Sequence, residues 1–510
     1  MDSTPTQKEF VLCFDGTGNQ FHSDSSDSNV LKIFRMPDRN SSNQYHYYQS
    51  GIGTYVTSAS LSHNGRIQKL KSAYAKAKAA ATGSTFADHV MGGYKLLMRY
   101  YCPGDQIYFF GFSRGAYIGL LEMGNDELIS FTWNTFTSWQ RRGSRTKAEK
   151  VRKEELKKRM EDFRETFCHL VSQILFLGLF DTVNSVPRFE NAWMRRSKFP
   201  YTARTSAKVI RHAVSIDEHR AKFRQDLLSG EGPNLPDGTS SVVPAPRSNN
   251  GSVAGSSRDG GEVTTEQDIE EVWFPGCHAD IGGGWEAKSG ECSLSYVSLL
   301  WMVHNAQLAG PQFDPSKLAD FNCLTVGETA QLEGENNPER AHARGGPVNQ
   351  ERASEGRKSD ASVQYALQAS SSYGRIRDCL RFGSGPSWAS VLSWKLMEYL
   401  PFHRMDLQED GSWKPVRWPL PRGEVRDIPD DAKVHVSAIR QLHTNSGYRP
   451  GNLIMGGGGR GTLRAQKKYG TGEWVVAGHE GCPLKETYIR KQKSRSSSAN
   501  LGNTASNSLV

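Results

Sequence analysis

The 510-residue sequence lacks several features that would assign it to a simple class of protein. It contains no run of about 18 apolar residues, so no membrane-spanning helix is predicted. Its first ten residues, MDSTPTQKEF, include no apolar core of the kind found in secretion signals. None of its eight cysteines belongs to a Cys-x-x-Cys pair, which argues against a zinc ribbon or a thioredoxin-like site. We therefore expect a soluble, cytoplasmic protein that holds no metal and no cofactor.

Apolar residues are also scarce for a chain of this length. Hydrophobic side chains make up 37% of the residues, which suggests that much of the chain lies outside a packed core. The net charge of +9 favours anionic partners such as a phospholipid surface, but only weakly, because much of it lies in runs typical of solvated faces and tails. Basic and aromatic residues do not alternate as they do in many nucleic-acid-binding proteins, so no nucleic acid partner is expected. The oligomeric state stays open.

Short apolar segments alternate with helical patterns through the first half of the chain. This alternation predicts an α/β fold resembling the alpha/beta hydrolases, with a mostly parallel sheet covered by helices on both faces. Most of the apolar segments end in a polar residue or a glycine-rich turn. The segments predicted as strands are Glu9–Phe14, Gln44–Thr54, Gln106–Phe110, Ser172–Phe180, Ala207–Ile216 and Glu270–Cys277.

Composition divides the chain into ordered and disordered parts. We predict a catalytic domain over residues 8–310 and an accessory C-terminal region over residues 373–485. Three segments are rich in Gly, Ser and Pro or in charged residues, and they are predicted to be disordered. They are an insertion at residues 229–268, a linker at residues 326–372 and a tail at residues 486–510.

The stretch GFSRG at residues 111–115 has the Gly-x-Ser-x-Gly spacing of a serine hydrolase. A nucleophile elbow needs a strand, a tight turn and a helix, with small residues two positions on either side of the serine. The apolar QIYFF segment supplies the strand, and Gly111 and Gly115 supply the small residues. Ser113 is therefore the candidate nucleophile, and the backbone N–H of Arg114 is a candidate donor to the oxyanion.

A second oxyanion donor usually follows an earlier strand. The turn DGTGN at residues 15–19 fits this position, with Gly16 allowing close backbone approach and Thr17 offering a backbone or side-chain donor. The same turn lacks the Gly-Lys-Ser/Thr ending of a phosphate-binding loop, so a nucleotide site is not favoured. An ordinary strand-to-helix turn, capped by Asp15, is the structural alternative.

A base and an acid must complete such a site. His278 lies in WFPGCHADIGGGW, after an apolar strand and before a glycine-rich turn, where an imidazole can project into a cleft. Two aspartates end strands between Ser113 and His278, in the chain order of the alpha/beta hydrolases. Asp181 follows an uncharged strand, whereas Asp217 lies one strand before the histidine, the commoner topological position. We favour Asp181 as the acid and leave Asp217 open.

These motifs together resemble one family of alpha/beta hydrolases. It is common in fungi and includes the catalytic domain of bacterial type VI secretion phospholipase effectors. The resemblance covers about residues 8–310 and implies a serine esterase or phospholipase, with a small-molecule or lipid ester as substrate and with Ser113, Asp181 and His278 as its triad. The matching stretches are VLCFDGTGN, YYQSGIGT, GFSRGAY, LGLFDTVNSV, HAVSIDEHRAKF and WFPGCHADIGGGW.

One departure from the family pattern follows the elbow. The family continues GFSRGAYTAR into a longer helix, whereas this chain runs GAYIGLLEMGND, with Gly119 and Gly124 weakening any helix. The helix after an elbow packs on the sheet, and its N-terminus favours an oxyanion. The alternative function is therefore a catalytically impaired, hydrolase-like binding or scaffold protein.

A second segment bears on membrane contact. The stretch SWASVLSWKLMEYLPFHRM at residues 387–405 carries aromatic and aliphatic residues at mixed helical spacing. A lipase could use such a helix as a lid or at a lipid interface, which would imply peripheral membrane contact. A helix packed in the core of the accessory region is the interpretation that the sequence favours.

Overall fold

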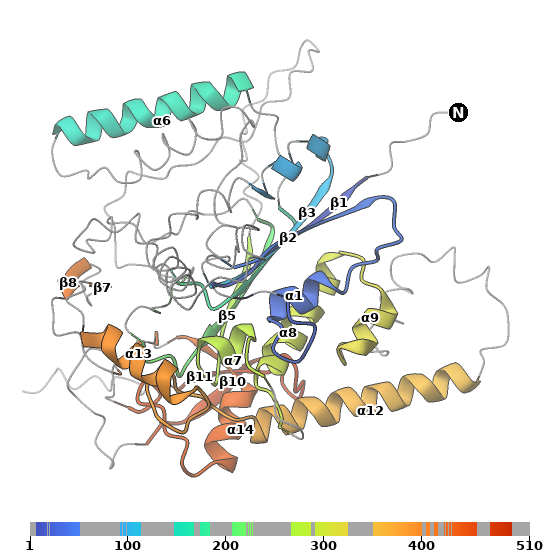
Figure 1. Ribbon diagram of the computed structural model, residues 1–510, viewed down its shortest axis with the longest axis vertical. Coiled ribbons are helices and arrows are strands. Elements are labelled where there is room, and N and C mark those ends of the chain that lie inside the picture. The colour runs from blue at the N-terminus through green and yellow to red at the C-terminus, as the bar shows by residue number, and fades with distance from the viewer. Residues whose placement is uncertain are drawn as a thin grey trace, which may run out of the picture.

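A computed structural model describes residues 7–17, 19, 21–51, 92–113, 147–167, 174–183, 207–227, 267–286, 291–324, 350–399, 404–407, 413–416, 423–455 and 470–491, with short gaps inside several of these ranges. Within them, nine strands form one sheet in the order β10-β11-β9-β6-β5-β4-β3-β1-β2 (Figure 1). The six strands β1 to β6 pair in parallel with their neighbours, and β9 pairs in parallel with β6, whereas β11 pairs antiparallel with both β9 and β10. The predicted α/β class with a mostly parallel sheet is confirmed.

The strands of the sheet lie close to the positions predicted from the apolar segments. Each of the six segments overlaps one strand, although β2 ends five residues before the predicted Thr54, β3 extends two residues beyond Phe110 and β6 begins two residues before Glu270. Three further strands come from the C-terminal region. The strands are β1 (Glu9–Phe14), β2 (Gln44–Gln49), β3 (Gln106–Phe112), β4 (Phe176–Phe180), β5 (Val209–Ser215), β6 (Asp268–Phe274), β9 (Lys433–His435), β10 (Trp474–Gly478) and β11 (Thr487–Arg490).

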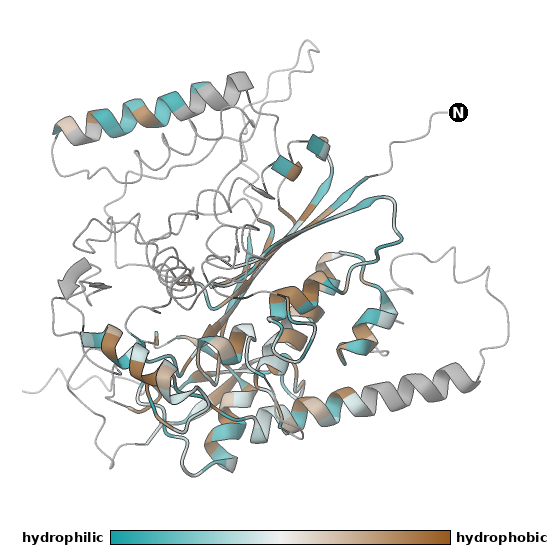
Figure 2. Cartoon of the chain, viewed as in Figure 1, coloured by the Kyte–Doolittle hydropathy of each residue, from teal (hydrophilic) through white to brown (hydrophobic). Residues whose placement is uncertain are grey.

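Strand β1, which lies next to the edge strand β2, shows why both faces of the sheet are buried. Val11 and Cys13 face one apolar cluster, and Phe10, Leu12 and Phe14 face another, because successive side chains of a strand point to opposite faces. Figure 2 shows the strands of the sheet as mostly hydrophobic along their middle part. A strand that is apolar on both faces needs cover on both, as parallel sheets generally do.

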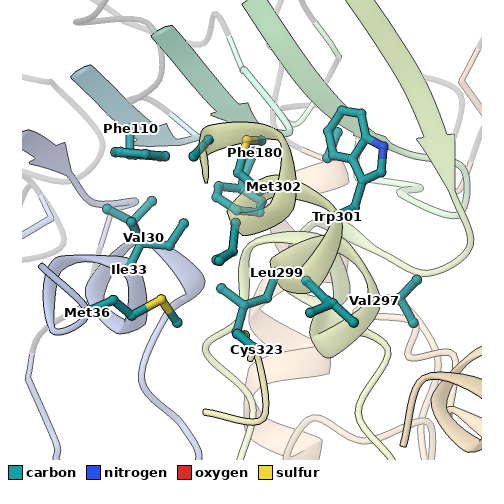
Figure 3. Close-up of a cluster of buried hydrophobic side chains, with 14 of the residues drawn as sticks. Val30, Ile33, Met36, Phe110, Phe180, Val297, Leu299, Trp301, Met302 and Cys323 are labelled. Atoms are coloured by element: carbon teal, nitrogen blue, oxygen red, sulfur yellow. The ribbon is translucent and has the colours of Figure 1, made fainter. Parts of the chain in front are cut away.

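Helices α1 (Asn29–Phe34) and α8 (Ser295–Ala309) cover one face, as Figure 1 shows. Trp301 and Met302 of α8 pack with Phe110 in the buried cluster drawn in Figure 3. Full burial of side chains of this size stabilises a fold by roughly 1.5–3 kcal/mol each. This cover keeps the sheet rigid beneath the carboxyl ends of its strands.

The C-terminal half differs from its prediction in two places. Helix α12 (Gln350–Tyr373) occupies residues predicted to be a disordered linker, because Val363 and Leu367, four residues apart, are buried against the core. Strand β11 occupies the first residues of the predicted tail. Both elements owe their order to tertiary contacts that the polar composition does not reveal. Residues 229–266 and 492–510 lie outside the described residues.

The sheet includes strands from both predicted regions, since β9 pairs with β6. Val434 of β9 and Ala438 and Ile439 of α14 (Val436–Thr444) share a buried cluster with Trp273 of β6. Further helices and a small hairpin complete the described residues. They are α6 (Lys147–Phe167), α7 (His278–Gly282), α9 (Pro315–Asp320), α13 (Trp388–Tyr399), β7 (Arg404–Leu407) and β8 (Trp413–Val416). No helix in the described part of the chain is long and apolar enough to cross a bilayer.

Candidate active site

Strand register brings the predicted site residues to one edge of the sheet. Phe112 pairs with Phe180 across β3 and β4, so Ser113 and Asp181 directly follow neighbouring strand ends. The N–H of Ser113 donates to the carbonyl of Phe180 at 3.0 Å, and the N–H of Asp181 donates to that of Ala213 at 2.7 Å. Sites in open parallel sheets form at this carboxyl edge.

Both residues have unusual backbone. Ser113 has a φ of 59° and Asp181 a φ of 42°, in the left-handed region that non-glycine residues seldom adopt. Ser113 is 3% exposed and Asp181 is fully buried. A strained serine between a strand and a tight turn is the geometry expected of a nucleophile elbow. Residues 114–146, which include Arg114 and the segment where a weakened helix was predicted, lie outside the described residues.

His278 contacts the favoured aspartate. Its Nδ1 lies 2.5 Å from Oδ2 of Asp181, and both side chains are buried. With Nδ1 donating to the carboxylate, Nε2 is the ring nitrogen left to accept a proton. Two aromatic rings hold the imidazole, with Phe112 at 4.6 Å and Phe223 at 4.8 Å between ring centroids.

The alternative aspartate has different partners. Oδ2 of Asp217 accepts from the N–H of Gly276 at 2.7 Å and from the hydroxyl of Tyr448 at 2.9 Å. These bonds fix the turn that leads from β6 into α7. Burial raises the pKa of the Asp217 carboxyl to about 6. Asp217 thus supports the segment that carries His278, and its recorded hydrogen bonds do not include the imidazole.

Glu218 and Arg220, which were not predicted as site residues from the sequence, support the backbone of His278. Oε2 of Glu218 accepts the backbone N–H of His278 at 3.2 Å, and both oxygens of Glu218 receive the guanidinium of Arg220 at 2.8 Å. Desolvation is the main cause that lowers the pKa of His278, and the Asp181 carboxylate opposes it. His278 is therefore held neutral at physiological pH, as a general base requires.

A third missed residue is Arg426, which is fully buried. Its two terminal nitrogens lie 2.5 and 2.9 Å from Oδ1 and Oδ2 of Asp181. The guanidinium holds the pKa of that carboxyl well below its usual range, against the opposing effect of burial. The sequence did not reveal it, because Arg426 lies 245 residues after Asp181 in the chain and no local pattern indicates that the two side chains meet.

The predicted oxyanion turn is held by Asp15. Its carboxylate accepts from the Gly16 N–H at 2.7 Å, from Ser28 at 2.6 Å and from Tyr48 at 2.8 Å. The Gly16 N–H is thus already engaged. A glycine at position 16 lets the backbone approach the Phe112 ring closely, since a Cβ there would lie 2.7 Å from that ring. The buried hydroxyl of Thr17 has no hydrogen-bond partner in the described structure.

Helix α13 is connected to His278 by two successive contacts between aromatic rings. Trp394 contacts Phe223 with ring centroids 5.4 Å apart, and Phe223 contacts His278. The Arg220 guanidinium lies over both rings, 3.7 Å from the Phe223 centroid and 4.6 Å from that of Trp394.

Among the described residues, no group of three or more His, Cys, Asp or Glu side chains is arranged to hold a metal ion. The arrangement is suited to moving a proton through His278.

Comparison with known proteins gives two sequence matches. Residues 8–305 match the family described as "T6SS, Phospholipase effector Tle1-like, catalytic domain", which is more than half of the chain. The uncharacterized protein YEL023C of Saccharomyces cerevisiae (strain ATCC 204508 / S288c) is 26% identical over 571 residues. That match covers 88% of this chain and 80% of the yeast protein.

Two solved structures also match. An uncharacterized protein from Pseudomonas aeruginosa aligns with a TM-score of 0.32 and 19% identity, over 76% of this chain and 56% of that one. The Tle1 effector bound to the VgrG spike of the type 6 secretion system aligns with a TM-score of 0.25 and 15% identity, over 55% of this chain and 51% of that one. The chain thus spans little more than half of either solved chain.

Proposed function

Since the chain belongs to the family of Tle1-like phospholipase effector catalytic domains, we propose that it is a serine hydrolase that cleaves carboxylic esters, with phospholipid acyl esters as its substrate class. The observation that carries the proposal is the 2.5 Å contact between Asp181 and His278, beside a strained Ser113 at the end of the adjacent strand. These are the residue types and the order of a Ser-His-Asp triad.

In the proposed reaction, Oγ of Ser113 attacks the ester carbonyl carbon and passes its proton to Nε2 of His278. The tetrahedral intermediate collapses, and His278 returns the proton to the departing alcohol. A water molecule, deprotonated by His278, then hydrolyses the acyl-serine and releases the acid. Asp181 keeps Nδ1 protonated and stabilises the imidazolium that forms in each half-reaction.

The developing oxyanion needs donors close to Ser113. The unpartnered Thr17 hydroxyl and the backbone N–H groups of Thr17 and Arg114 are the proposed donors. The N–H of Gly16 is less suited, because Asp15 already accepts it. Removing one such donor typically costs about 10²–10³ in rate.

A fluorophosphonate probe tests the proposal directly. We expect the purified protein to be labelled, Ser113→Ala and His278→Asn to remain unlabelled, and Asp181→Asn to react at least about 10³-fold more slowly. Asp217→Asn is the matched control, and it should retain labelling because its hydrogen bonds are to Gly276 and Tyr448. A folded wild-type protein that takes up no probe would favour the binding or scaffold alternative.

We further propose that helix α13 presents the lipid-facing surface of this hydrolase. Trp388, Leu392 and Leu396 are 72%, 54% and 64% exposed, and their four-residue spacing places them along one stripe of the helix. The opposite side of α13 carries Trp394, which connects to His278 through Phe223. A stripe of this kind, on the outer side of a helix whose other side contacts the candidate site, fits the surface of a phospholipid bilayer.

Vesicle binding tests this surface. Replacing the three stripe residues by serine should weaken co-sedimentation with phosphatidylcholine vesicles by at least about tenfold, because three apolar side chains lose their burial in lipid. Hydrolysis of a short-chain ester in solution should be little changed. Leu308→Ser with Tyr365→Ser is the matched control, since both side chains are exposed on other helices. Equal vesicle binding by all three proteins would contradict the proposal.

A further inference from the structure

Arg426 lies outside the region that matches the family, which ends at residue 305. We propose that Arg426 is a positioning residue for the triad, which acts through Asp181 to orient His278 and to keep it unprotonated. The inference rests on the proposed serine hydrolase function. It makes the C-terminal region an integral part of the active site.

The first step of the argument is the number of donors around Asp181. Oδ1 accepts from Nη1 of Arg426 at 2.5 Å and from the N–H of Ser215 at 2.9 Å. Oδ2 accepts from Nη2 of Arg426 at 2.9 Å and from Nδ1 of His278 at 2.5 Å. A carboxylate has about four lone-pair sites, so all of them are filled. The carboxylate can therefore rotate only if Arg426 moves with it.

The second step is that Arg426 is itself held from several sides. Nη1 also donates to the carbonyl of Ser215 at 3.1 Å, and Nη2 donates to the carbonyl of Phe223. Ser215 ends β5, and Phe223 is the residue whose ring packs on His278. One guanidinium thus joins the strand end, the carboxylate and the aromatic wall of the imidazole. A planar fork with fixed donor directions suits this task, whereas a lysine ammonium does not.

The third step is charge. A permanent cation on Asp181 offsets part of the negative charge that would otherwise stabilise a protonated His278. The other charged and titratable groups around the imidazole include both signs, so Arg426 can shift the balance. These groups are Asp181 and Glu218, which are negative, and Arg220, which is positive. With Arg426 present, His278 is available as a base at a lower pH.

Two substitutions separate the orienting role from the charge. Arg426→Gln keeps a donor but removes the cation, so the acidic limb of the fluorophosphonate labelling rate should move upward by about one pH unit. Arg426→Lys keeps the cation but loses the fork, so the limb should stay in place while the plateau rate falls by about tenfold or more. Arg377→Gln is the matched control, because Arg377 is a buried C-terminal arginine paired with Asp280 and Glu291. The acidic limb of the labelling rate in Arg377→Gln should stay at the wild-type pH.

A readout without activity distinguishes this inference from the proposed function. The titration of His278 can be followed by NMR in histidine-labelled protein and assigned by the signal missing in His278→Asn. We expect a higher His278 pKa in Arg426→Gln than in the wild type. Absence of labelling in the wild type would refute the hydrolase and leave this titration interpretable. The positioning role would be overturned if the pKa of His278 in folded Arg426→Gln equalled that of the wild type. It would equally be overturned if folded Arg426→Lys were labelled at the wild-type rate at every pH.

Discussion

Ser113 and Asp181 share a backbone conformation that costs a non-glycine residue roughly 1–3 kcal/mol. Each is held there by a hydrogen bond from its own N–H to the next strand, to Phe180 and to Ala213. The sheet thus imposes the strain, and the strain turns each side chain out of the strand direction. Both candidate catalytic groups consequently depend on strand pairing as much as on their immediate neighbours.

Asp217 shows how a strand-end carboxylate can serve the site without touching the base. Its pKa is raised from an ordinary value of 3.8 to about 6, mainly by desolvation. Between these two pH values the folded state binds more protons at this group than the unfolded chain does. The contribution of Asp217 to the free energy of unfolding therefore falls as pH rises through this window.

The substitution Asp217→Asn should remove this pH dependence, because asparagine imitates the protonated carboxyl. Relative to the wild type, we expect the variant to gain about 2–3 kcal/mol of stability as the pH rises from about 4 to above 6. Chemical denaturation at a series of pH values measures the difference between the two proteins, which cancels the titration of every other group. A difference that stays constant from pH 4 to 7 would show that Asp217 is not buried with a raised pKa.

At the scale of elements, α7 is packed unusually tightly on the elbow. A Cβ at Gly282 would lie 2.0 Å from the Phe112 ring, and a Cβ at Gly16 would lie 2.7 Å from the same ring. Phe112 immediately precedes Ser113 and its ring also contacts His278. Two glycines on separate elements therefore determine where the ring between the candidate nucleophile and base can lie.

The substitution Gly282→Ala tests this packing. Gly282 is the last residue of α7, where alanine gains less than the roughly 1 kcal/mol that it gains over glycine in a helix interior, and the added methyl must displace the Phe112 ring. Overpacking of this kind typically costs about 1–3 kcal/mol, so we expect a lower melting temperature and a labelling rate reduced by about tenfold or more. Gly470→Ala is the control, since no atom of the described residues lies within 4 Å of its added Cβ. Wild-type labelling in Gly282→Ala would show that the ring has room to move.

The elements also show what could be predicted from the sequence. Strands β1, β3 and β4 are buried on both faces, and polar residues follow β3 and β4 directly, so local pattern alone predicted these strands and placed Ser113 and Asp181 at strand ends. Strand β9 has three residues and depends on pairing with β6, which no local pattern reveals. Arg426 was missed for the same reason, because its significance arises only when the C-terminal region folds onto Asp181.

At the scale of the whole molecule, the C-terminal strands extend the sheet that the N-terminal strands begin. This continuity joins the buried cluster around Trp273 and Val434 to the edge that carries the candidate site. It also means that α13, which follows α12 in the chain, belongs to the same body of structure that provides Arg426. The candidate site is therefore built from both halves of the chain, whereas the proposed lipid-facing stripe comes from the C-terminal region alone.

The net charge of +9 adds a second, less specific attraction to anionic membranes. Exposed charges are screened by salt, whereas burial of the α13 stripe in lipid is not. We therefore expect binding to phosphatidylserine vesicles to weaken by at least about tenfold between about 50 and 500 mM salt, while binding to phosphatidylcholine vesicles changes little. The variant with serine at Trp388, Leu392 and Leu396 should keep the salt-sensitive component and lose the insensitive one. Salt-insensitive binding to both vesicle types by that variant would mean that another apolar surface contacts the lipid.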